Sequence, residues 1–287
     1  MSYIGFAWIT AILYSSSFLV GKYSTKHKIA NPWLYNFIWS FIIVILSTII
    51  AIFQGAGIPH DWRSLVLAGF LSAIASVTYT LSIYLLDVTV LGPLYNFRTP
   101  MAVLLGVLMF GEKLSMNQMM LIGIMTIAGM FISMDERFSI RTFFRKPIAF
   151  ALLTIAVSAL YNASLKYASV QNGYWSTVLW FNIINQVFLV VTVPLFWKEL
   201  HRVRPTDYIH VSISAVLAGL GGITVIPALL GNLGITAAIL SLPIAMVIAI
   251  ALSVVAPHLL EKHPWKVYAV RLGAAAVMFG SALMLSR

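Results

Sequence analysis

The sequence predicts an all-α integral membrane protein with ten transmembrane helices, arranged as two inverted five-helix repeats. The first observation is composition: 61% of the 287 residues are hydrophobic and 9% are charged, whereas soluble domains carry roughly 25% charged residues. The second is a series of apolar runs of about 18 residues or more, each long enough to cross a bilayer as a helix. The third is a set of local motifs that recurs in the second half of the chain. Unpaired backbone groups are not tolerated in lipid, so we expect these runs to be helices.

The predicted spans divide the chain into two halves of five. In chain order they are residues 3–21, 33–53, 64–84, 89–110, 116–134, 148–166, 175–197, 208–230, 235–257 and 266–285. Residues 1–134 form the first repeat, 135–147 a basic connecting loop, and 148–287 the second repeat. The first span has no basic segment before it and no clear small-residue cleavage site, which predicts a retained span rather than a removable signal. The loops between the spans are too short for a soluble domain.

Lysine and arginine are distributed unequally between the two sides of the predicted bundle. The side that holds the N-terminus, called here the N-terminal side, collects 4 of the 18 basic residues, the opposite side collects 13, and Arg98 lies within a span. Cytoplasmic loops carry an excess of these residues. The count therefore places the opposite side in the cytoplasm and both termini outside. Because the basic residues lie in loops between apolar runs, the net charge of +10 does not indicate a nucleic-acid partner.

Short motifs of the first half return in the second half at a nearly constant offset of 143 to 149 residues. The matching positions are Lys22-Tyr23 with Lys166-Tyr167, Pro100 with Pro243, and Glu112-Lys113 with Glu261-Lys262. An odd number of spans in each half reverses the membrane orientation of the second copy. Inverted repeats of this kind underlie many secondary transporters, which bind their substrate near the midplane at the repeat interface.

The stretch from Gly92 to Met130 carries a recognisable pattern of glycines, a proline and a Gly-Glu pair. The pattern consists of Pro100, Gly106, Gly111-Glu112, Leu114, Gln118, Gly123 and Gly129. It resembles the signature half of EamA-type proteins, which belong to the drug/metabolite transporter superfamily. In the second half the Gly-Glu pair is replaced around Pro257 to Glu261, with about six extra residues. The resemblance implies a ten-helix inverted-repeat fold that moves small metabolites by alternating access. The family's habit places the termini in the cytoplasm, so their orientation stays open between this habit and the charge count.

Arg98 is the one formal charge predicted to lie far from either membrane surface. Charges within a span are expensive, usually face a protein interior or a water-filled cavity, and mark functional sites by default. The five N–H donors of a guanidinium suit a carboxylate or a phosphate. The alternative is a structural arginine, because Pro100 has no N–H and leaves the carbonyl of Asn96 without its helical donor. Pro100 and Pro243 are also predicted hinges of the fourth and ninth spans.

Polar side chains at helical spacing predict a cavity among the first, third, fourth, sixth and seventh spans. Residues three and four apart share one helix face, and polar faces within a membrane either bond neighbouring helices or line a cavity. Both interpretations stay open for the serines, threonines and amides. The predicted substrate-binding residues are Tyr14, Ser17, Tyr79, Tyr95, Arg98, Thr99, Tyr161, Asn162, Trp175, Asn182, Asn185 and Gln186. Gly219, Gly221 and Gly222 in the eighth span are predicted to allow close helix contact.

The coupling ion is weakly specified, since the acidic residues all lie at loops or span ends. Glu112 and Asp87 are the best-placed candidates for proton coupling, and the alternative is that both are solvated end charges. No metal site is predicted: His258, Glu261 and His263 lack the four-residue histidine spacing of a helical zinc site. With no cysteine and no triad or nucleophile-elbow pattern, the sequence indicates neither an enzyme nor a cofactor.

The sequence therefore predicts a multi-pass transporter of the inner or plasma membrane. The predicted substrate is a small metabolite, an amino acid or a related carboxylate-bearing or amphiphilic solute, which the protein exports. The alternatives are an organic-cation or drug exporter, a lipid-linked sugar flippase of the same fold, and a non-transporting membrane subunit. The predicted partners are the substrate, the lipid bilayer, and a proton or an exchange solute, with the chain acting as a monomer or a weak dimer.

Overall fold

The computed structural model describes residues 2–85, 97–132, 146–201, 204–248 and 265–286, and all regular structure in these ranges is helical. The helices of the first half are α1 (Tyr3–His27), α2 (Pro32–Phe53), α3 (Trp62–Leu85), α5 (Arg98–Phe110) and α6 (Met116–Ile132). Those of the second half are α7 (Lys146–Asn172), α8 (Tyr174–Leu189), α9 (Tyr208–Gly231), α10 (Leu233–Leu240) and α12 (Trp265–Leu285). Short 3₁₀ turns η2 (Val190–Leu195), η3 (Trp197–Glu199) and η4 (Pro205–Asp207) connect α8 to α9.

Local sequence explains where several helices begin and end. Asn31 caps α2 by accepting bonds from the N–H groups of Trp33 and Leu34, at 2.9 and 3.2 Å, and Pro32 supplies the preset φ of a first helical residue. Gly111 ends α5 with a φ of 61°, a conformation that glycine adopts without strain. Gln118 and the Ser115 hydroxyl exchange bonds with each other's backbone N–H at the start of α6, as in a capping box.

Within the described residues, six helical segments are long and apolar enough to span a membrane: α1, α2, α3, most of α7, α8 with η2, and α9 with η4. Four shorter apolar helices, at 98–110, 116–129, 233–248 and 269–285, overlap the fourth, fifth, ninth and tenth predicted spans, so the total of ten spans stays a prediction. The main difference from the prediction is in length, since α1 and α7 continue six residues beyond their predicted ends. Lys166 consequently lies inside α7 and is buried, so the prediction that the basic residues other than Arg98 lie in loops is wrong for Lys166.

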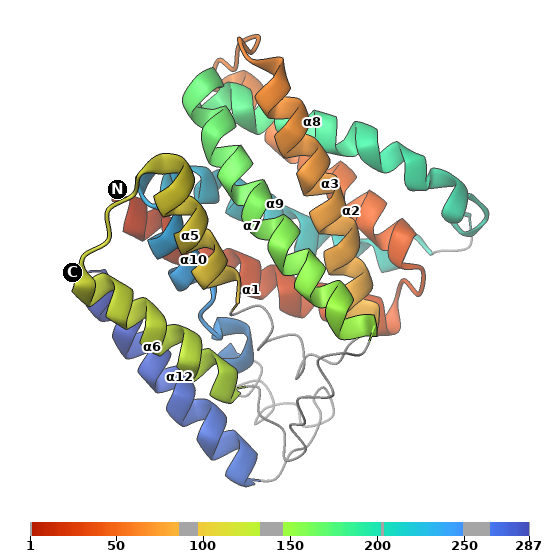
Figure 1. Ribbon diagram of the computed structural model, residues 1–287. Helices are drawn as coiled ribbons and strands as arrows, with labels where there is room; N and C mark the ends of the chain where they lie inside the picture. The colour runs from red at the N-terminus through yellow and green to blue at the C-terminus, as the bar shows by residue number, and fades with distance from the viewer. Residues whose placement is uncertain (1, 86–96, 133–145, 202–203, 249–264, 287) are drawn as a thin grey trace.

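The most extensive helix contacts follow a regular scheme across the two halves. α1 packs along α9, and α3 packs along α7. α3 also packs on α8, α2 on α9, α5 on α7, and α1 on α10. Three further pairs, α2 with α8, α5 with α10, and α6 with α12, each join one helix of the first half to one of the second. The halves are therefore interleaved rather than laid side by side (Figure 1).

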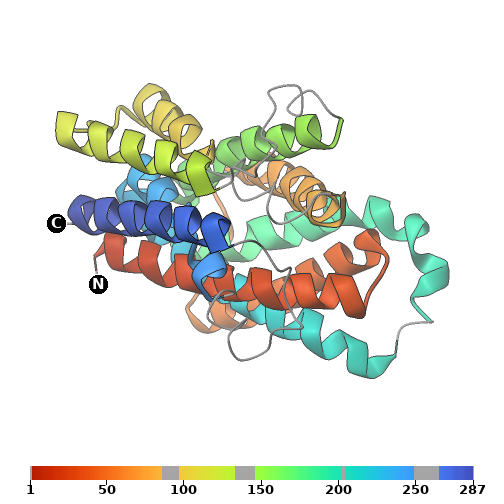
Figure 2. The same cartoon turned by 90° about the horizontal axis from the view of Figure 1, so that it is seen from below.

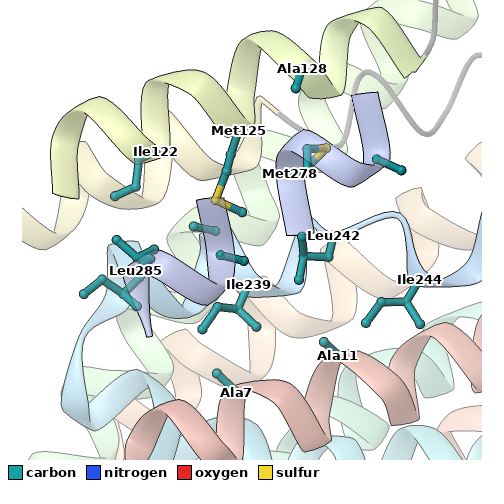
Figure 3. Packing of buried hydrophobic residues seen from close by; sticks show 14 of the residues in the cluster. Ala7, Ala11, Ile122, Met125, Ala128, Ile239, Leu242, Ile244, Met278 and Leu285 are labelled. Atoms are coloured by element: carbon teal, nitrogen blue, oxygen red, sulfur yellow. The ribbon is translucent and has the colours of Figure 1, made fainter. Parts of the chain in front are cut away.

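α6 and α12 lie side by side at one edge of the bundle (Figure 1). A buried apolar cluster ties this pair to α1 and α10, with Ala7 and Ala11 facing Ile239, Met125 and Met278 (Figure 3). The start of α1 and the end of α12 lie next to each other in both views (Figures 1 and 2), and the Trp8 indole donates to the Ser286 hydroxyl at 3.2 Å. The two ends of the described chain thus meet on the same side of the molecule.

Candidate functional site

Four of the predicted binding residues lie at one depth on α7 and α8. The two helices are joined at Gly173 and run in opposite directions away from it. The number of residues between a position and this turn therefore gives its approximate depth in the membrane. Tyr161, Asn162, Asn185 and Gln186 stand ten to twelve residues from the helix ends that meet there, about 15 to 18 Å along the axis at 1.5 Å per residue. This is about half the thickness of a bilayer hydrocarbon core of roughly 30 Å.

Tyr14 and Arg98 come to the same depth from two other helices. Tyr14 is eleven residues from the start of α1, and Arg98 is twelve residues from the end of α5, again about 16 to 18 Å. The side chains of Tyr14 and Arg98 are in electrostatic range of each other, as are Tyr161 and Arg98. Ser72 of α3 lies close to the Tyr161 hydroxyl. Residues of four helices therefore stand at a similar distance from their helix ends on the N-terminal side, and this set is called here the polar level: Tyr14, Arg98, Tyr161, Asn162, Asn185 and Gln186.

The amides of this polar level are buried and incompletely hydrogen-bonded. Gln186 is 8% exposed, and neither its carbonyl oxygen nor its amide nitrogen has a partner among the described residues. Asn162 is 2% exposed, and within the same residues its amide nitrogen is unpartnered. The Asn185 amide nitrogen donates to the Ser40 hydroxyl at 2.7 Å, but the side-chain oxygen of Asn185 accepts no hydrogen bond from the described part of the chain. A buried polar atom left without a partner costs about 1 to 3 kcal/mol, so such a group marks a place where water or a ligand completes the bonding.

Three of the other predicted binding residues are held by helix contacts instead. The Ser17 hydroxyl donates to the Ser214 carbonyl of α9 at 2.8 Å. The Thr99 hydroxyl donates to the Ala237 carbonyl of α10 at 3.4 Å. The Asn182 amide donates to the Val178 carbonyl of its own helix at 2.8 Å. These bonds correspond to the helix-bonding alternative that the sequence left open.

Two predicted residues lie at other depths. Trp175 is the second residue of α8, and its ring contacts that of Tyr174 at a tilt of 50°, with 4.4 Å between the centroids. It therefore lies near the N-terminal side, about 15 Å from the amides. Tyr79 lies on α3 two turns beyond Ser72 and is partly buried. Tyr95, Asp87 and the group His258, Glu261 and His263 lie outside the described residues.

Glu112 occupies a buried ion pair at the N-terminal side. Its Oε1 accepts a bond from the Lys166 ammonium at 2.6 Å and another from the Leu233 N–H at 2.7 Å, and its Oε2 accepts from the Gly234 N–H at 3.4 Å. The two side chains are only 7% and 8% exposed. The carboxylate thus caps the first turn of α10, where a negative charge is favoured. Burial contradicts the alternative of a solvated end charge, whereas proton coupling through Glu112 stays a prediction.

Lys166 is the main residue of this region that sequence reasoning missed. It was counted as a loop charge because the apolar run around it stops there. The available signal was the repeat itself, since Lys166 occupies the position of Lys22 in the first half. The ammonium of Lys22 donates to the Ile83 carbonyl near the end of α3, at 3.1 Å. Both lysines therefore bond the end of a neighbouring helix, one directly and one through Glu112.

The predicted hinge prolines both stand where helices begin. Pro100 lies in the first turn of α5. Pro243 follows the end of α10 at Leu240 and precedes a new helical turn at Ile244. By contrast, Pro227 lies inside the continuous helix α9. These positions are compatible with hinges, which stay a prediction.

The hollows on the outer surface do not coincide with the polar level. One lies between α6 and α12 and is lined by Ile124, Ile127, Ala128, Val270, Ala274 and Val277. Another lies between α3 and α8 and is lined by Trp62, Arg63, Val66, Leu67, Phe70 and Phe188. Their apolar walls are typical of a surface that faces lipid. Among the described residues, no three His, Asp or Glu side chains gather as a metal site would require.

The long apolar helices define this chain as a multi-pass integral membrane protein. Residues 1–134 match the profile of the EamA-like transporter family, which lies within the drug/metabolite transporter superfamily. Over residues 1–134 the chain is thus similar to the EamA-like transporters, which are multi-pass membrane transporters of the drug/metabolite type.

Comparison with solved structures shows the fold over nearly the whole chain. A structure titled only "Crystal structure of protein" superposes with a TM-score of 0.73 at 17% sequence identity, covering 96% of this chain and 93% of the other. At this identity the likeness concerns the fold alone. The comparison with curated proteins found no match.

Proposed function

We propose that this protein transports a small carboxylate-bearing solute, an amino acid or a related metabolite, by alternating access between two inverted five-helix repeats. The substrate binds at the polar level formed by Arg98, Tyr14, Tyr161 and the amides of α7 and α8. The observation that carries this proposal is the presence of incompletely bonded, buried amides on α7 and α8 at a distance from the helix ends similar to that of Arg98, in a chain that resembles a transporter family.

The pattern of helix contacts supports the two repeats. Each helix of the first half has a counterpart in the second: α1 and α7, α2 and α8, α3 and α9, α5 and α10, α6 and α12. Exchanging every helix for its counterpart turns the α1–α9 contact into α7–α3, α3–α8 into α9–α2, and α5–α7 into α10–α1, all of which occur. The pairs α2–α8, α5–α10 and α6–α12 are unchanged by the exchange. A two-fold relation between the halves produces such a scheme, and two inverted repeats have one.

The chemistry of the polar level favours a substrate with hydrogen-bond acceptors. Arg98 brings a permanent positive charge, which a carboxylate can meet with two parallel bonds. The amide nitrogens of Asn162 and Gln186 add donors that have no protein acceptor within the described residues. The Asn185 and Gln186 carbonyl oxygens can accept from an amino group. Glu112, the carboxylate that follows α5, is already paired with Lys166.

A second candidate function is export of an organic cation. The observation that favours it is the pair of partly buried tyrosines, Tyr14 and Tyr161, at the polar level. Aromatic faces attract cations, especially where water is excluded. Arg98 in electrostatic range of both rings opposes a cation bound between them.

The test is a thermal-shift screen of the purified protein against amino acids, organic anions, organic cations and sugar phosphates. Wild type, Arg98→Ala and Arg98→Lys are compared side by side. We expect stabilisation by a carboxylate-bearing compound that is lost in Arg98→Ala and reduced in Arg98→Lys, because lysine cannot make the bidentate contact. Stabilisation by cations, equal in all three proteins, would reverse the assignment and favour the aromatic cation site.

A further inference from the structure

The end of α5, the start of α10 and a side chain from within α7 meet around the Glu112 carboxylate at the N-terminal side. Glu112 follows the end of α5, Lys166 belongs to α7, and Leu233 and Gly234 begin α10. One carboxylate oxygen bonds both the Lys166 ammonium at 2.6 Å and the Leu233 N–H at 2.7 Å. A single side chain of the first half therefore fastens two helices of the second half to each other and to α5.

The surroundings are shaped to hold this carboxylate away from water. Gly106 leaves room for it, since a Cβ on that glycine would lie 2.5 Å from the Oε2 atom. The Phe110 ring covers the Lys166 ammonium, with 4.9 Å from the nitrogen to the ring centroid. Charges that are buried in this way are strongly destabilised when one partner is removed. The pair is therefore either closed and bonded, or open and hydrated.

The pair lies between the polar level and the N-terminal side. Along α7, Asn162 is one helical turn deeper than Lys166 on the same face. Along α5, Arg98 is twelve residues deeper than the helix end, about 18 Å. Between these depths α5 and α10 remain in contact, because a Cβ on Gly234 would lie 3.3 Å from the Cα of Val103, and Thr99 bonds Ala237. A solute that entered the polar level from the N-terminal side between these helices would have to pass the pair.

From this arrangement we propose that Glu112 and Lys166 form the gate of the N-terminal side, with the first turn of α10 as the moving part. When the carboxylate releases Lys166 and Leu233, the start of α10 separates from α5 and α7, and water reaches the polar level. The structure described here is the state closed at this gate. This inference rests on alternating access in the proposed function and adds which contacts hold one side shut.

The experiment uses the absence of cysteine from the chain. Ala102→Cys places one thiol on α5, at a position that is fully buried and about 12 Å inside the end of that helix. Its rate of reaction with a water-soluble maleimide, measured in lipid nanodiscs, reports opening toward the gate. The gate is weakened by Glu112→Gln, which keeps an acceptor for α10 and loses the charge, or by Lys166→Met, which keeps the stem over Phe110.

We expect both variants to raise the rate of Ala102→Cys labelling about tenfold, which corresponds to a shift of about 1.4 kcal/mol in the opening equilibrium. Lys113→Met is the matched control, because Lys113 is the exposed neighbour of Glu112, and it should leave the rate unchanged. A second reporter, Ala215→Cys, is fully buried on α9 away from the gate and should not respond.

An unchanged labelling rate of Ala102→Cys in both gate variants would overturn the gate proposal. An equal rise in the labelling rates of Ala102→Cys and Ala215→Cys would also overturn it, because it would indicate that the whole protein is destabilised. These outcomes are separate from a failure of the proposed function. Ligand-induced thermal stabilisation depends on the polar level and not on the gate, so it can persist when the gate proposal fails. A gate that responds as expected with no stabilisation by any ligand class would instead leave the substrate assignment without support.

Discussion

The polar side chains of this protein differ in how many of their hydrogen-bonding atoms have a partner. Asn182, Asn185 and Gln186 form one stripe on α8, yet Asn182 is bonded to its own helix and Asn185 donates to Ser40 of α2. Gln186 is buried and has no partner within the described residues. The stripe could be predicted from spacing alone. Spacing could not predict which of these amides lacks a hydrogen-bond partner, because the neighbouring side chains come from helices far away in the sequence.

Replacement of Gln186 by leucine separates stability from binding. An unpartnered buried amide costs about 1 to 3 kcal/mol, so Gln186→Leu should leave the thermal unfolding temperature unchanged or raise it. Loss of a substrate contact should at the same time reduce ligand-induced stabilisation and raise the KM for transport about tenfold or more.

Asn182→Leu is the matched control for this prediction, since its amide is already bonded within α8. It should change the KM little. If Gln186→Leu is destabilising and transports with an unaltered KM, the amide is a structural group and not a substrate contact.

At the scale of the helices, close packing depends on glycines at the points of contact. α1 and α9 run antiparallel, bonded by Thr10 to Thr224 at 2.8 Å and by Ser17 to Ser214 at 3.0 Å. Between these bonds the Tyr14 ring lies against Gly221. This packing agrees with the prediction that Gly219, Gly221 and Gly222 allow close helix contact. The residue that each glycine contacts depends on how the helices assemble.

Gly221→Ala should therefore be destabilising. A Cβ at this position would lie 2.6 Å from the Tyr14 ring, and overpacking of this kind costs about 1 to 3 kcal/mol. We expect a lower unfolding temperature, and also weaker ligand-induced stabilisation because Tyr14 belongs to the polar level.

Gly222→Ala is the control, because its nearest neighbour, the Tyr14 hydroxyl, would be 4.0 Å away. Alanine is the better helix former by about 1 kcal/mol, so this variant should be as stable as wild type or more so. Equal destabilisation by the two substitutions would show that steric contact with Tyr14 is not the cause.

At the scale of the whole molecule, the arrangement of helix ends defines two sides. The start of α1 packs on the end of α9 through Tyr3 and Gly231. The N-terminal side also holds the bond from the Asp61 N–H to the side-chain Oδ1 of Asn172 at 2.7 Å. The gate of Glu112 and Lys166 lies on this side, so its orientation in the cell decides which compartment the gate faces.

Labelling of single cysteines should show that the N-terminal side is extracellular, as the distribution of basic residues indicates. Asn117→Cys at the start of α6 and Ala30→Cys between α1 and α2 are exposed positions on opposite sides. In intact cells a membrane-impermeant maleimide should react with Asn117→Cys, and with Ala30→Cys only after permeabilisation. The reverse pattern would place the termini in the cytoplasm, and labelling of both in intact cells would contradict the predicted number of spans between them.

The sequence by itself determined the class of the protein and the rough positions of its helices. Apolar runs, prolines and capping residues act within about 20 residues, and lipid forces such runs into helices whatever their neighbours are. The family resemblance and the predicted repeat also rest on local motifs, which the sequence shows directly. The depth of the polar level also follows from helix length, once the helix ends are known.

Only the tertiary structure decided which of these residues touch. Glu112 bonds Lys166, 54 residues away, and Leu233, 121 residues away. Nothing local to Glu112 distinguishes a solvated end charge from a buried one, because burial of its charge depends on α7 and α10 arriving at the same point. The same is true of Ser17, Thr99 and Asn185, whose assignment to helix contact or cavity is set by the helix that packs opposite.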